Sequence, residues 1–426
     1  MHIALISEHA SPLAIAGGVD SGGQNIYVNH VGRCLARAGH QVDVFTRRDS
    51  ESLPPVVYVR PGLRVIHVPA GPSRFIAKEK LLPYMPEFSR RLESVARARG
   101  GYDVSHANFF MSGIASMRLR RTLGVPFVIT LHALGLVRRQ HQGTADGFPD
   151  ERISIERELI RCADRVIAEC PQDRSDLIEL YGCDRPRIVT VPCGYDPQEF
   201  APDDRRTARA KLALAQEEFV VLQLGRLVPR KGIDNVVRAL ALLVHQHKVT
   251  ARLMVVGGEA DTPCEKATPE IARLQQIAAQ LDVADRVTFT GRRRRDDLRT
   301  FYNAADVFVT TPWYEPFGIT PLEAMACGTP VIGANVGGIK YSVVDRATGF
   351  LVPPNDPSVL AERLAVLAEN RVLARAMGLA GMRRAREKFT WDNIAEQLAL
   401  SYAEVARSPA TQFPPQHALR LTEAHK

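Results

Sequence analysis

Short apolar runs separated by amphipathic segments recur along this chain in two sets. The first set covers residues 2–6, 41–45, 127–131, 166–168 and 188–191, and the second covers residues 219–224, 253–256, 287–289, 307–309 and 331–332. Such runs are typical of buried parallel strands. Because strands that alternate with helices form doubly wound sheets, the sequence predicts an α/β protein with two Rossmann-like domains.

Proline, glycine and aspartate are concentrated between residues 192 and 202, directly after the first set of runs. These residue types interrupt helices and strands, so the segment predicts a domain boundary. A chain of 426 residues that is 45% hydrophobic is long enough to form two cores. The expected organisation is a first domain of residues 1–194, a second domain of residues 195–390, a final helix within residues 391–407 and a tail of residues 408–426.

The final helix is expected from Trp391 to about Val405. It has Ile394, Leu398 and Tyr402 on one face, at helical spacing. Residues from 408 onward have no such periodicity, which predicts a tail.

Basic residues exceed acidic ones by 55 to 47, which gives a formal net charge of +8. This balance suits phosphate-bearing ligands or an anionic membrane surface and does not require nucleic acid. The densest basic run, residues 292–295, is followed by two aspartates and lacks the aromatic residues of a base-stacking surface. We interpret it as a solvated segment or the rim of a nucleotide site, and expect no nucleic-acid partner.

None of the seven cysteines forms a Cys-x-x-Cys pair, so neither a disulfide framework nor a zinc site is predicted. A reducing, cytoplasmic location is therefore expected. The first apolar run is too short for a signal peptide, and no apolar stretch is long enough to span a bilayer. Peripheral contact with a membrane stays open.

Two glutamates eight residues apart, Glu315 and Glu323, carry the most information about chemistry. They follow the apolar run at 306–310, and a helical pattern opens at Phe317-Gly318. Glu315 is then on the loop after a strand and Glu323 is inside the next helix, so both carboxylates are expected to flank one crevice.

Free backbone N–H groups at this helix start, from Phe317 through Gly318 and Ile319 to Thr320, suit an anion or a hydroxyl-rich ligand. The simpler interpretation of the glutamates is a loop acid and a solvated helix position. A second glycine turn, Gly337-Gly338, follows the next apolar run. A backbone with this many glycines is usually approached closely by a ligand or by another chain segment. A functional site is therefore favoured.

In this context, Glu315 and Glu323 resemble the paired-glutamate signature of retaining nucleotide-sugar glycosyltransferases of the GT-B fold. The resemblance covers residues 2 to about 405. It implies two Rossmann-like domains facing across a cleft, with the C-terminal helix crossing back to the N-terminal domain. The first domain would bind the acceptor. The second would bind the sugar nucleotide, with Glu323 on the ribose hydroxyls and Glu315 on the sugar hydroxyls.

The run at 219–224 leads into Gly225, and Arg226 and Lys231 lie in the turn before a helix expected near Ile233. The spacing of a nucleoside-triphosphate phosphate loop is absent. Isolated cations of this kind often only solvate a loop, but at the end of a strand they can neutralise a leaving pyrophosphate. In the resembling family, the arginine and lysine of this motif bind the nucleotide diphosphate, and Arg226 and Lys231 match them.

Glycines also follow the first strand, from Gly17 to Gly23, and lead into a helix expected near Gln24. A helix start beneath such a loop is an anion site. The dinucleotide spacing Gly-x-Gly-x-x-Gly is absent, so a dehydrogenase is the weaker interpretation. The loop resembles that of sucrose-phosphate synthases and of the inositol-phosphate glycosyltransferases of mycothiol synthesis. The resemblance places Gly22 and Gly23 against the donor phosphates or the acceptor, and Gln24 beside the acceptor.

His132 matches the histidine that these families place near the donor sugar, although a histidine at a strand end is as often structural. Lys78 and Arg152 match basic residues that bind the acceptor phosphate in the same relatives, whereas surface cations are the commoner case. Phe109 and Ala133 stand where the inositol-phosphate pattern has hydroxyl groups. A phosphorylated acceptor therefore fits better than inositol phosphate in particular.

Together, these residues and the resemblance predict a retaining hexosyltransferase. Its expected donor is a nucleoside-diphosphate sugar, with a UDP-sugar favoured although the residues do not separate uridine, adenosine and guanosine donors. Its expected acceptor is a hydroxyl compound such as a sugar phosphate. The expected catalytic residues are Glu315, Arg226, Lys231 and His132. No Asp-x-Asp motif occurs, so no metal or other cofactor is expected. The alternatives are a sugar-nucleotide epimerase or hydrolase of the same fold and a non-catalytic sugar-nucleotide or polyanion-binding protein.

Overall fold

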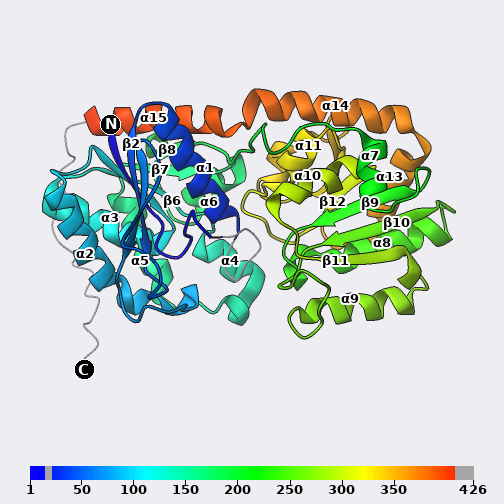
Figure 1. Cartoon of the computed structure of the whole chain (residues 1–426), viewed down its shortest axis with the longest axis horizontal. Helices are drawn as coiled ribbons and strands as arrows, with labels where there is room; N and C mark the ends of the chain where they lie inside the picture. Colours follow the sequence, from blue (N-terminus) through cyan, green and yellow to red (C-terminus); the bar gives the residue numbers. More distant parts are fainter. Residues whose placement is uncertain (15–21, 408–426) are drawn as a thin grey trace. The chain divides into compact units, whose positions relative to one another are not determined.

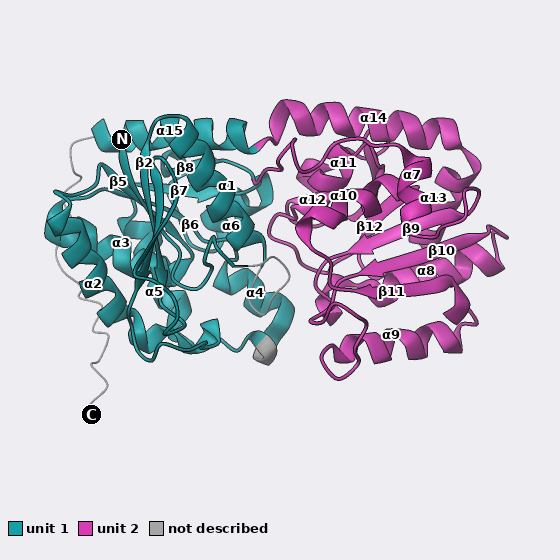
Figure 2. Cartoon of the chain, viewed as in Figure 1, with its two compact units in different colours: residues 1–14, 20–192, 391–426 teal, residues 15–19, 193–390 magenta. Residues whose placement is uncertain are grey.

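The computed structural model describes residues 1–14 and 22–407, without the side chains of residues 144 and 145. The backbone divides into two compact units (Figure 2). Of the described chain, unit 1 holds residues 1–14, 22–192 and 391–407, and unit 2 holds residues 193–390. The division lies two residues before the boundary expected after residue 194. The expected tail lies outside the described residues.

Unit 1 contains an eight-stranded sheet in the order β3-β4-β2-β1-β5-β6-β7-β8. Neighbouring strands are parallel except for β3 and β4. The strands are β1 (His2–Ile6), β2 (Gln41–Arg47), β3 (Val56–Arg60), β4 (Leu63–Val68), β5 (Val104–Asn108), β6 (Phe127–Thr130), β7 (Arg165–Ala168) and β8 (Ile188–Thr190). All five apolar runs predicted in this half are confirmed as strands.

Strands β3, β4 and β5 were not predicted. Strand β5 reads Val-Ser-His-Ala-Asn and is buried throughout. Its polar groups are satisfied inside the protein, because His106 contacts the hydroxyl groups of Tyr402 and Thr130 at 2.6 and 2.8 Å. A strand of this kind lacks the apolar pattern that identifies buried strands in a sequence.

The helices of unit 1 are α1 (Gly23–Arg37), α2 (Met85–Ala98), α3 (Phe110–Leu123), α4 (Gly135–Gln142), α5 (Glu151–Cys162), α6 (Pro171–Glu179) and α15 (Trp391–Arg407). From β1 the chain passes through α1 to β2 in one direction, and from β5 it passes through α3 to β6 in the other. Because such crossovers are right-handed, α1 and α3 cover opposite faces of the sheet (Figure 1).

Helix α15 packs against α1 in unit 1. The ring of Trp391 is stacked on His30, with ring centroids 5.4 Å apart. Ile394, Leu398 and Tyr402 are completely buried, which confirms the predicted apolar face. The prediction that the last helix returns to the N-terminal domain is also confirmed.

Unit 2 contains a six-stranded parallel sheet in the order β11-β10-β9-β12-β13-β14. The strands are β9 (Phe219–Leu224), β10 (Ala251–Val256), β11 (Val287–Gly291), β12 (Val307–Thr310), β13 (Val331–Ala334) and β14 (Gly349–Val352). The helices are α7 (Arg205–Lys211), α8 (Ile233–His245), α9 (Pro269–Gln280), α10 (Arg295–Ala304), α11 (Thr320–Ala326), α12 (Ile339–Ser342), α13 (Pro357–Glu369) and α14 (Arg371–Lys388). All five predicted runs are strands, and only β14 was not predicted.

The strand order reverses at one place in each sheet, between β1 and β5 in unit 1 and between β9 and β12 in unit 2. Ligands of open α/β sheets bind beyond the carboxyl ends of the strands at such a point. Both units are thus confirmed as Rossmann-like, and the segments after these four strands are where side chains with chemical roles are expected. Among the described residues, no helix is both long and apolar enough to cross a membrane.

Candidate active site

Glu315 lies in the loop after β12 and contacts the cations that follow β9. The ammonium group of Lys231 donates a hydrogen bond to Oε2 of Glu315, and Nη1 of Arg230 lies 3.7 Å from the same oxygen. The side chain of Glu315 is only 13% exposed. Residues 84 positions apart that the sequence assigned to one site are therefore in direct contact.

Positive charge dominates around Glu315. Burial would raise the pKa of Glu315, but the charges of Lys231, Arg230 and Arg226 hold it below its ordinary value. Burial lowers the pKa of Lys231, and the carboxylate of Glu315 offsets part of this shift. Arg226 itself is exposed. Three cations against one carboxylate leave a net positive charge, which suits an anionic ligand.

Two glycines bring the segment after β13 against the Glu315 loop. A Cβ atom at Gly337 would overlap the carbonyl oxygen of Glu315, and one at Gly338 would lie 2.5 Å from Cα of Phe317. The N–H group of Gly338 also donates a hydrogen bond to the carbonyl oxygen of Pro316 at 3.1 Å. The bare turn predicted here is thus approached by another segment of the chain, which fixes the backbone that carries Glu315.

Helix α11 begins at Thr320, three residues later than predicted. Gly318 has φ of +91°, in the left-handed region, so a right-handed helix cannot start before it. Among the described residues, the backbone N–H groups of Phe317, Gly318 and Ile319 have no hydrogen-bond partner. These free donors therefore belong to a loop rather than to the first turn of a helix.

Glu323 lies inside α11, as predicted, and its carboxylate is buried. The side chain is 2% exposed. Tyr302 donates a hydrogen bond to Oε2 at 2.9 Å, and Nη1 of Arg295 donates one to Oε1 at 2.8 Å. Burial raises the pKa of Tyr302 well above its ordinary value, so the phenol remains a neutral donor. A carboxylate this deeply buried needs such donors.

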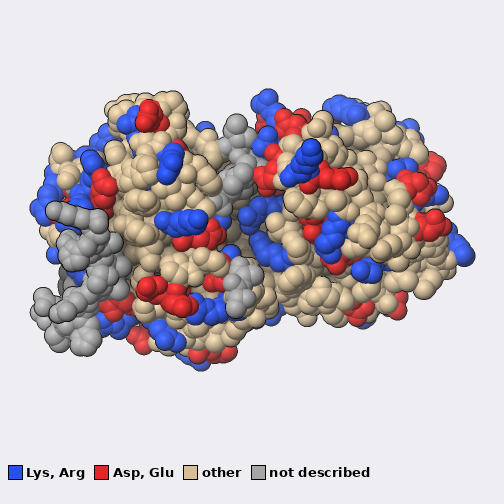
Figure 3. All heavy atoms as spheres, turned by 90° about the horizontal axis from the view of Figure 1, so that it is seen from below, with Lys and Arg blue, Asp and Glu red and all other residues tan. Residues whose placement is uncertain are grey.

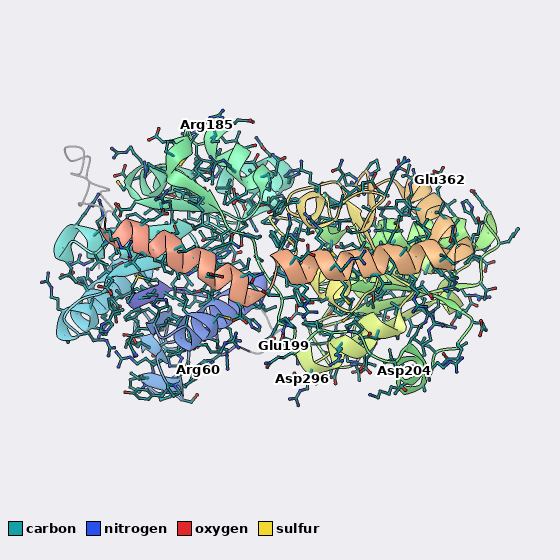
Figure 4. The ribbon with its side chains drawn as sticks, turned by 90° about the horizontal axis from the view of Figure 1, so that it is seen from above. Arg60, Arg185, Glu199, Asp204, Asp296 and Glu362 are labelled. Carbon is teal, nitrogen blue, oxygen red and sulfur yellow. The ribbon has the colours of Figure 1, made fainter. Side chains whose placement is uncertain are left out.

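The environment of Arg295 differs most from the one predicted from the sequence. Its Nε lies 2.5 Å from Oε2 of Glu199, and its guanidinium carbon lies 4.9 Å from the centre of the Phe200 ring. Glu199, labelled in Figure 4, comes from the segment between β8 and α7. Of the two interpretations of residues 292–295, a solvated segment or the rim of a nucleotide site, the first is therefore wrong for Arg295. The available signal was the seven-residue spacing of Arg295 and Tyr302, which places both on one face of α10.

His132 follows β6 and is held between the ends of the neighbouring strands. Its Nδ1 lies 3.0 Å from Oε1 of Glu169, after β7, and its Nε2 lies 3.1 Å from Oδ1 of Asn108, at the end of β5. The ring of Tyr27 contacts it edge-on at 4.9 Å. His132 has φ of +55°, which is uncommon for this residue type. The structure thus fixes the orientation of this ring.

Helix α1 begins at Gly23, next to the predicted start at Gln24. The N–H group of Gly22 donates a hydrogen bond to Oδ1 of Asn25 at 2.9 Å. The side-chain amide of Gln24 donates to Oγ of Ser7 at 3.1 Å and to the carbonyl oxygen of Asn108 at 3.0 Å. Gln24 therefore ties α1 to the segments at the ends of β1 and β5. Residues 17–21 of the predicted glycine loop lie outside the described residues.

Both halves of the chain match known families. Residues 204–384 match the model of glycosyl transferases group 1, and residues 22–194 match the glycosyl transferase 4-like domain. A D-inositol 3-phosphate glycosyltransferase of Geodermatophilus obscurus is 37% identical over 415 residues, which cover 96% of this chain and 90% of that protein. This chain belongs to the group 1 glycosyltransferases of the GT-B fold. It is an enzyme that transfers a sugar from a nucleotide sugar.

Solved structures agree with this assignment. Sucrose-phosphate synthase from Thermosynechococcus elongatus has a TM-score of 0.86 and 36% identity, and the match covers 94% of this chain and 98% of that one. HepE of Anabaena, in complex with UDP and glucose, has a TM-score of 0.72 at 21% identity, which supports the fold alone.

The two basic residues predicted to bind the acceptor of this glycosyltransferase lie in different environments. The Nζ atom of Lys78 lies 3.7 Å from Glu79, and its side chain is 19% exposed. Arg152 is 1% exposed, donates a hydrogen bond from Nε to Glu156 at 2.7 Å, and lies 4.5 Å from the centre of the Phe148 ring. Arg152 is therefore not the surface cation that the sequence left as an alternative.

Several residues that contact the predicted ones were missed, and the sequence signal differed among four of them. Arg230 stands beside Lys231, so counting every cation of that turn would have found it. Glu169 directly follows the predicted run at 166–168 and was detectable as an acid at a strand end. Asn108 and Arg295 gave weaker signals, because β5 was not predicted and the basic run appeared to be solvated.

Proposed function

We propose that this enzyme is a retaining glycosyltransferase that moves a hexosyl group from a UDP-sugar to a hydroxyl acceptor, with sugar phosphates as the acceptor class. The observation that carries the proposal is the contact of Glu315 with Lys231 and Arg230 at the carboxyl ends of β9 and β12. An ionised carboxylate can accept hydrogen bonds from sugar hydroxyls, while the cations stabilise the departing diphosphate.

For the nucleotide, we assign the ribose hydroxyls to Glu323. Tyr302 and Arg295 each donate to one of its oxygens. An ionised carboxylate offers about four lone-pair positions, so two further hydrogen bonds can be accepted. The free N–H groups of Phe317, Gly318 and Ile319 are suited to the remaining polar groups of the donor.

We assign the diphosphate to Arg226 and Lys231, with Gly22 and Gly23 against the donor phosphates or the acceptor. These cations neutralise the charge of the leaving diphosphate, as a divalent ion would, so we propose that the reaction needs no metal. His132, oriented by Glu169 and Asn108, is assigned to the donor sugar. Retention follows from attack on the same face, with a leaving phosphate oxygen taking the acceptor's proton, as the family resemblance implies.

The choice of substrates rests on the relatives. HepE was solved with UDP-glucose, and the proteins at 37% identity are named for D-inositol 3-phosphate. Lys78 and Gln24 are assigned to the acceptor. Arg152 is assigned to the acceptor as well, because its buried Nη1 atom has no hydrogen-bond partner among the described residues. Phe109 and Ala133 carry no hydroxyl group, which favours a sugar phosphate other than inositol phosphate.

A sugar-nucleotide hydrolase or epimerase of the same fold would act without an acceptor. A polyanion-binding protein would need a continuous basic surface, whereas basic and acidic side chains are interspersed on the face shown in Figure 3. The family assignment favours transfer.

The test is nucleotide release from UDP-, ADP- and GDP-glucose, with and without D-inositol 3-phosphate or hexose 6-phosphates, for wild type and Glu315→Ala. We expect release from UDP-glucose that rises with one phosphate acceptor and falls at least tenfold in the variant, about the loss of one transition-state contact. The anomeric configuration of the product, read by NMR, tests retention. Equal release with and without every acceptor would instead establish a hydrolase, and conversion of UDP-glucose to an isomeric sugar nucleotide without net release would establish an epimerase.

A further inference from the structure

A second cluster of cations lies in unit 2, at the amino ends of β9 and β12, the two strands whose carboxyl ends carry the candidate active site. Its centre is Asp306, directly before β12, with a side chain that is only 2% exposed. Oδ1 of Asp306 accepts hydrogen bonds from Nη2 of Arg205, in α7, and from Nη1 of Arg371, the first residue of α14. Oδ2 accepts from Nη2 of Arg209 and from the N–H group of Val220, each at 2.7 Å. The function proposed above uses none of these residues.

Arg209 alone is sufficient to neutralise Asp306. It is completely buried. Its guanidinium group also donates to four backbone carbonyl oxygens at 2.6–3.0 Å, those of Ala215, Gln216, Glu218 and Ala304. A buried ion pair whose remaining donors are hydrogen-bonded in this way needs no further cation.

Arg205 and Arg371 are therefore in excess of what Asp306 needs. Their side chains are 43% and 48% exposed. Each directs one nitrogen at the same oxygen of Asp306, and neither has another hydrogen-bond partner among the described residues. Because both donate to one atom, the two guanidinium groups are neighbours that repel each other. Burial and the charges of these two residues lower the pKa of Arg209, against the opposing effect of Asp306.

No other acid compensates this positive charge. Asp204, labelled in Figure 4, caps α7 by accepting from the N–H and the hydroxyl group of Thr207, each at 2.7 Å. Among the described residues, Asp306 is the only acid that forms an ion pair with Arg205 or Arg371. Three guanidinium groups against one carboxylate leave a formal charge of +2 on the cluster.

We propose that a phosphate-type dianion binds between Arg205 and Arg371. The planar fork of an arginine matches two phosphate oxygens at once, and its charge-assisted hydrogen bonds are strong. Two half-exposed arginines with uncommitted N–H groups supply such forks from α7 and from α14. Inorganic phosphate and phosphate monoesters both have this chemistry. The inference goes beyond the proposed function and does not depend on it, because the site lies at the other end of the sheet.

The bound dianion joins two helices that support the candidate nucleotide site. Helix α7 packs against α10, where Arg209 donates to the carbonyl oxygen of Ala304 at 3.0 Å. Helix α14 packs against α11, and a Cβ atom at Gly378 would overlap the carbonyl oxygen of Gly328, just after α11. Helices α10 and α11 carry Glu323 and its two hydrogen-bond donors. The expected effect of the ligand is therefore slower local opening of α7 and α14.

The test is amide hydrogen exchange, followed by mass spectrometry, in inorganic phosphate or methyl phosphate against chloride at equal ionic strength. In wild type, we expect phosphate to slow exchange at least about threefold in α7 and in the first turn of α14. The double variant Arg205→Gln, Arg371→Gln should lose this protection. Arg383→Gln, which removes an exposed cation further along α14, is the matched control and should keep it.

A milder variant, Arg371→Lys, keeps a cation beside Asp306 and removes the planar fork, so it guards against loss of folding. We expect the phosphate concentration for half-maximal protection to rise about tenfold, the cost of one charge-assisted hydrogen bond. Circular dichroism confirms that each variant is folded.

Two results would overturn the inference. Protection that is equal in wild type and the double variant is one, and protection confined to the segments after β9 and β12 is the other, because the anion would then bind only at the candidate active site. Protection by methyl phosphate would support monoesters as ligands, and protection by inorganic phosphate alone would support the free anion. A wild type without transferase activity would overturn the proposed function and leave this inference standing.

Discussion

The two units place chemically active side chains at the same point of the same fold, but with opposite electrostatic character. In unit 2, Lys231, Arg230 and Arg226 surround the single carboxylate of Glu315. In unit 1, two histidines are each held by a buried carboxylate, His9 by Glu8 and His132 by Glu169. The first arrangement suits an anion that gains charge as it leaves, and the second fixes the orientation of two imidazole rings.

The comparison also shows how each site is supported. In unit 2, glycines let backbone segments press on the loop that carries Glu315, so the support is mainly steric. In unit 1, hydrogen bonds between side chains from different strands hold His132, so the support is polar. Substitutions in the two units should therefore fail in different ways.

The largest expected effect is in unit 2, for Lys231→Ala. This change removes one cation from the proposed diphosphate site and leaves the buried Glu315 without its closest partner. We expect kcat to fall roughly 100- to 1000-fold, the usual cost of a lost transition-state donor. Steady-state kinetics with UDP-glucose measure it. Arg238→Ala, which removes an exposed cation from α8, is the matched control and should retain wild-type activity.

If Lys231→Ala and Arg226→Ala both kept wild-type kcat, the cations would have no part in the reaction. The contrast between the units would then concern folding alone.

The next effect tests the steric support. Gly337→Ala adds a methyl group that overlaps the carbonyl oxygen of Glu315, at a residue with φ of +46°. We expect a loss of roughly 2–3 kcal/mol in the free energy of unfolding, as for overpacked sites, and a lower kcat because the loop moves. Urea unfolding and kinetics measure the two effects.

Gly328→Ala is the control for backbone strain. Gly328 also has a positive φ, of +76°, but a Cβ atom there would meet nothing within 4 Å. We expect it to lose only about 1 kcal/mol, the cost of the left-handed conformation, with unchanged kcat. Equal losses in both variants would show that conformation, and not contact with the Glu315 loop, sets the need for glycine at position 337.

The same contrast explains what the sequence could predict. The unit 2 site lies largely in two continuous segments, after β9 and after β12, so Arg226, Lys231 and Glu315 were identified together. The strands around them were also predicted, because an apolar run buried on both faces is visible in sequence. The sequence pattern did not predict the burial of Glu323 and Arg295 in unit 2, because this burial depends on which side of α10 and α11 faces the core.

The unit 1 site was harder to predict because it is assembled from the ends of four strands. His132 was identified through resemblance, but Asn108 was missed because β5 has buried, hydrogen-bonded polar residues instead of an apolar run. Arg152 was recognised as a basic residue, but its enclosure by Phe148 and Glu156 comes from tertiary packing. Local spacing therefore predicts a site within one loop better than a site shared among strands.

The smallest expected effect tests the hydrogen-bonded site of unit 1. Burial, together with the charge of the nearby carboxylate of Glu169, raises the pKa of Asp173 in α6 to about 8. In the unfolded chain the pKa is about 3.9. Between these values the folded protein holds one more proton than the unfolded chain, so its stability falls as the pH rises and becomes constant above the folded pKa. We expect the free energy of unfolding to fall by about 1 kcal/mol between pH 6 and pH 7, measured by urea unfolding.

Asp173→Asn should remove this pH dependence, and Asp285→Asn, at an exposed position, should not. If the pH dependence of stability persisted in Asp173→Asn, another group would have to take up the proton. The unit 1 site would then have no titrating acid to distinguish it from the unit 2 site, where Glu315 is ionised.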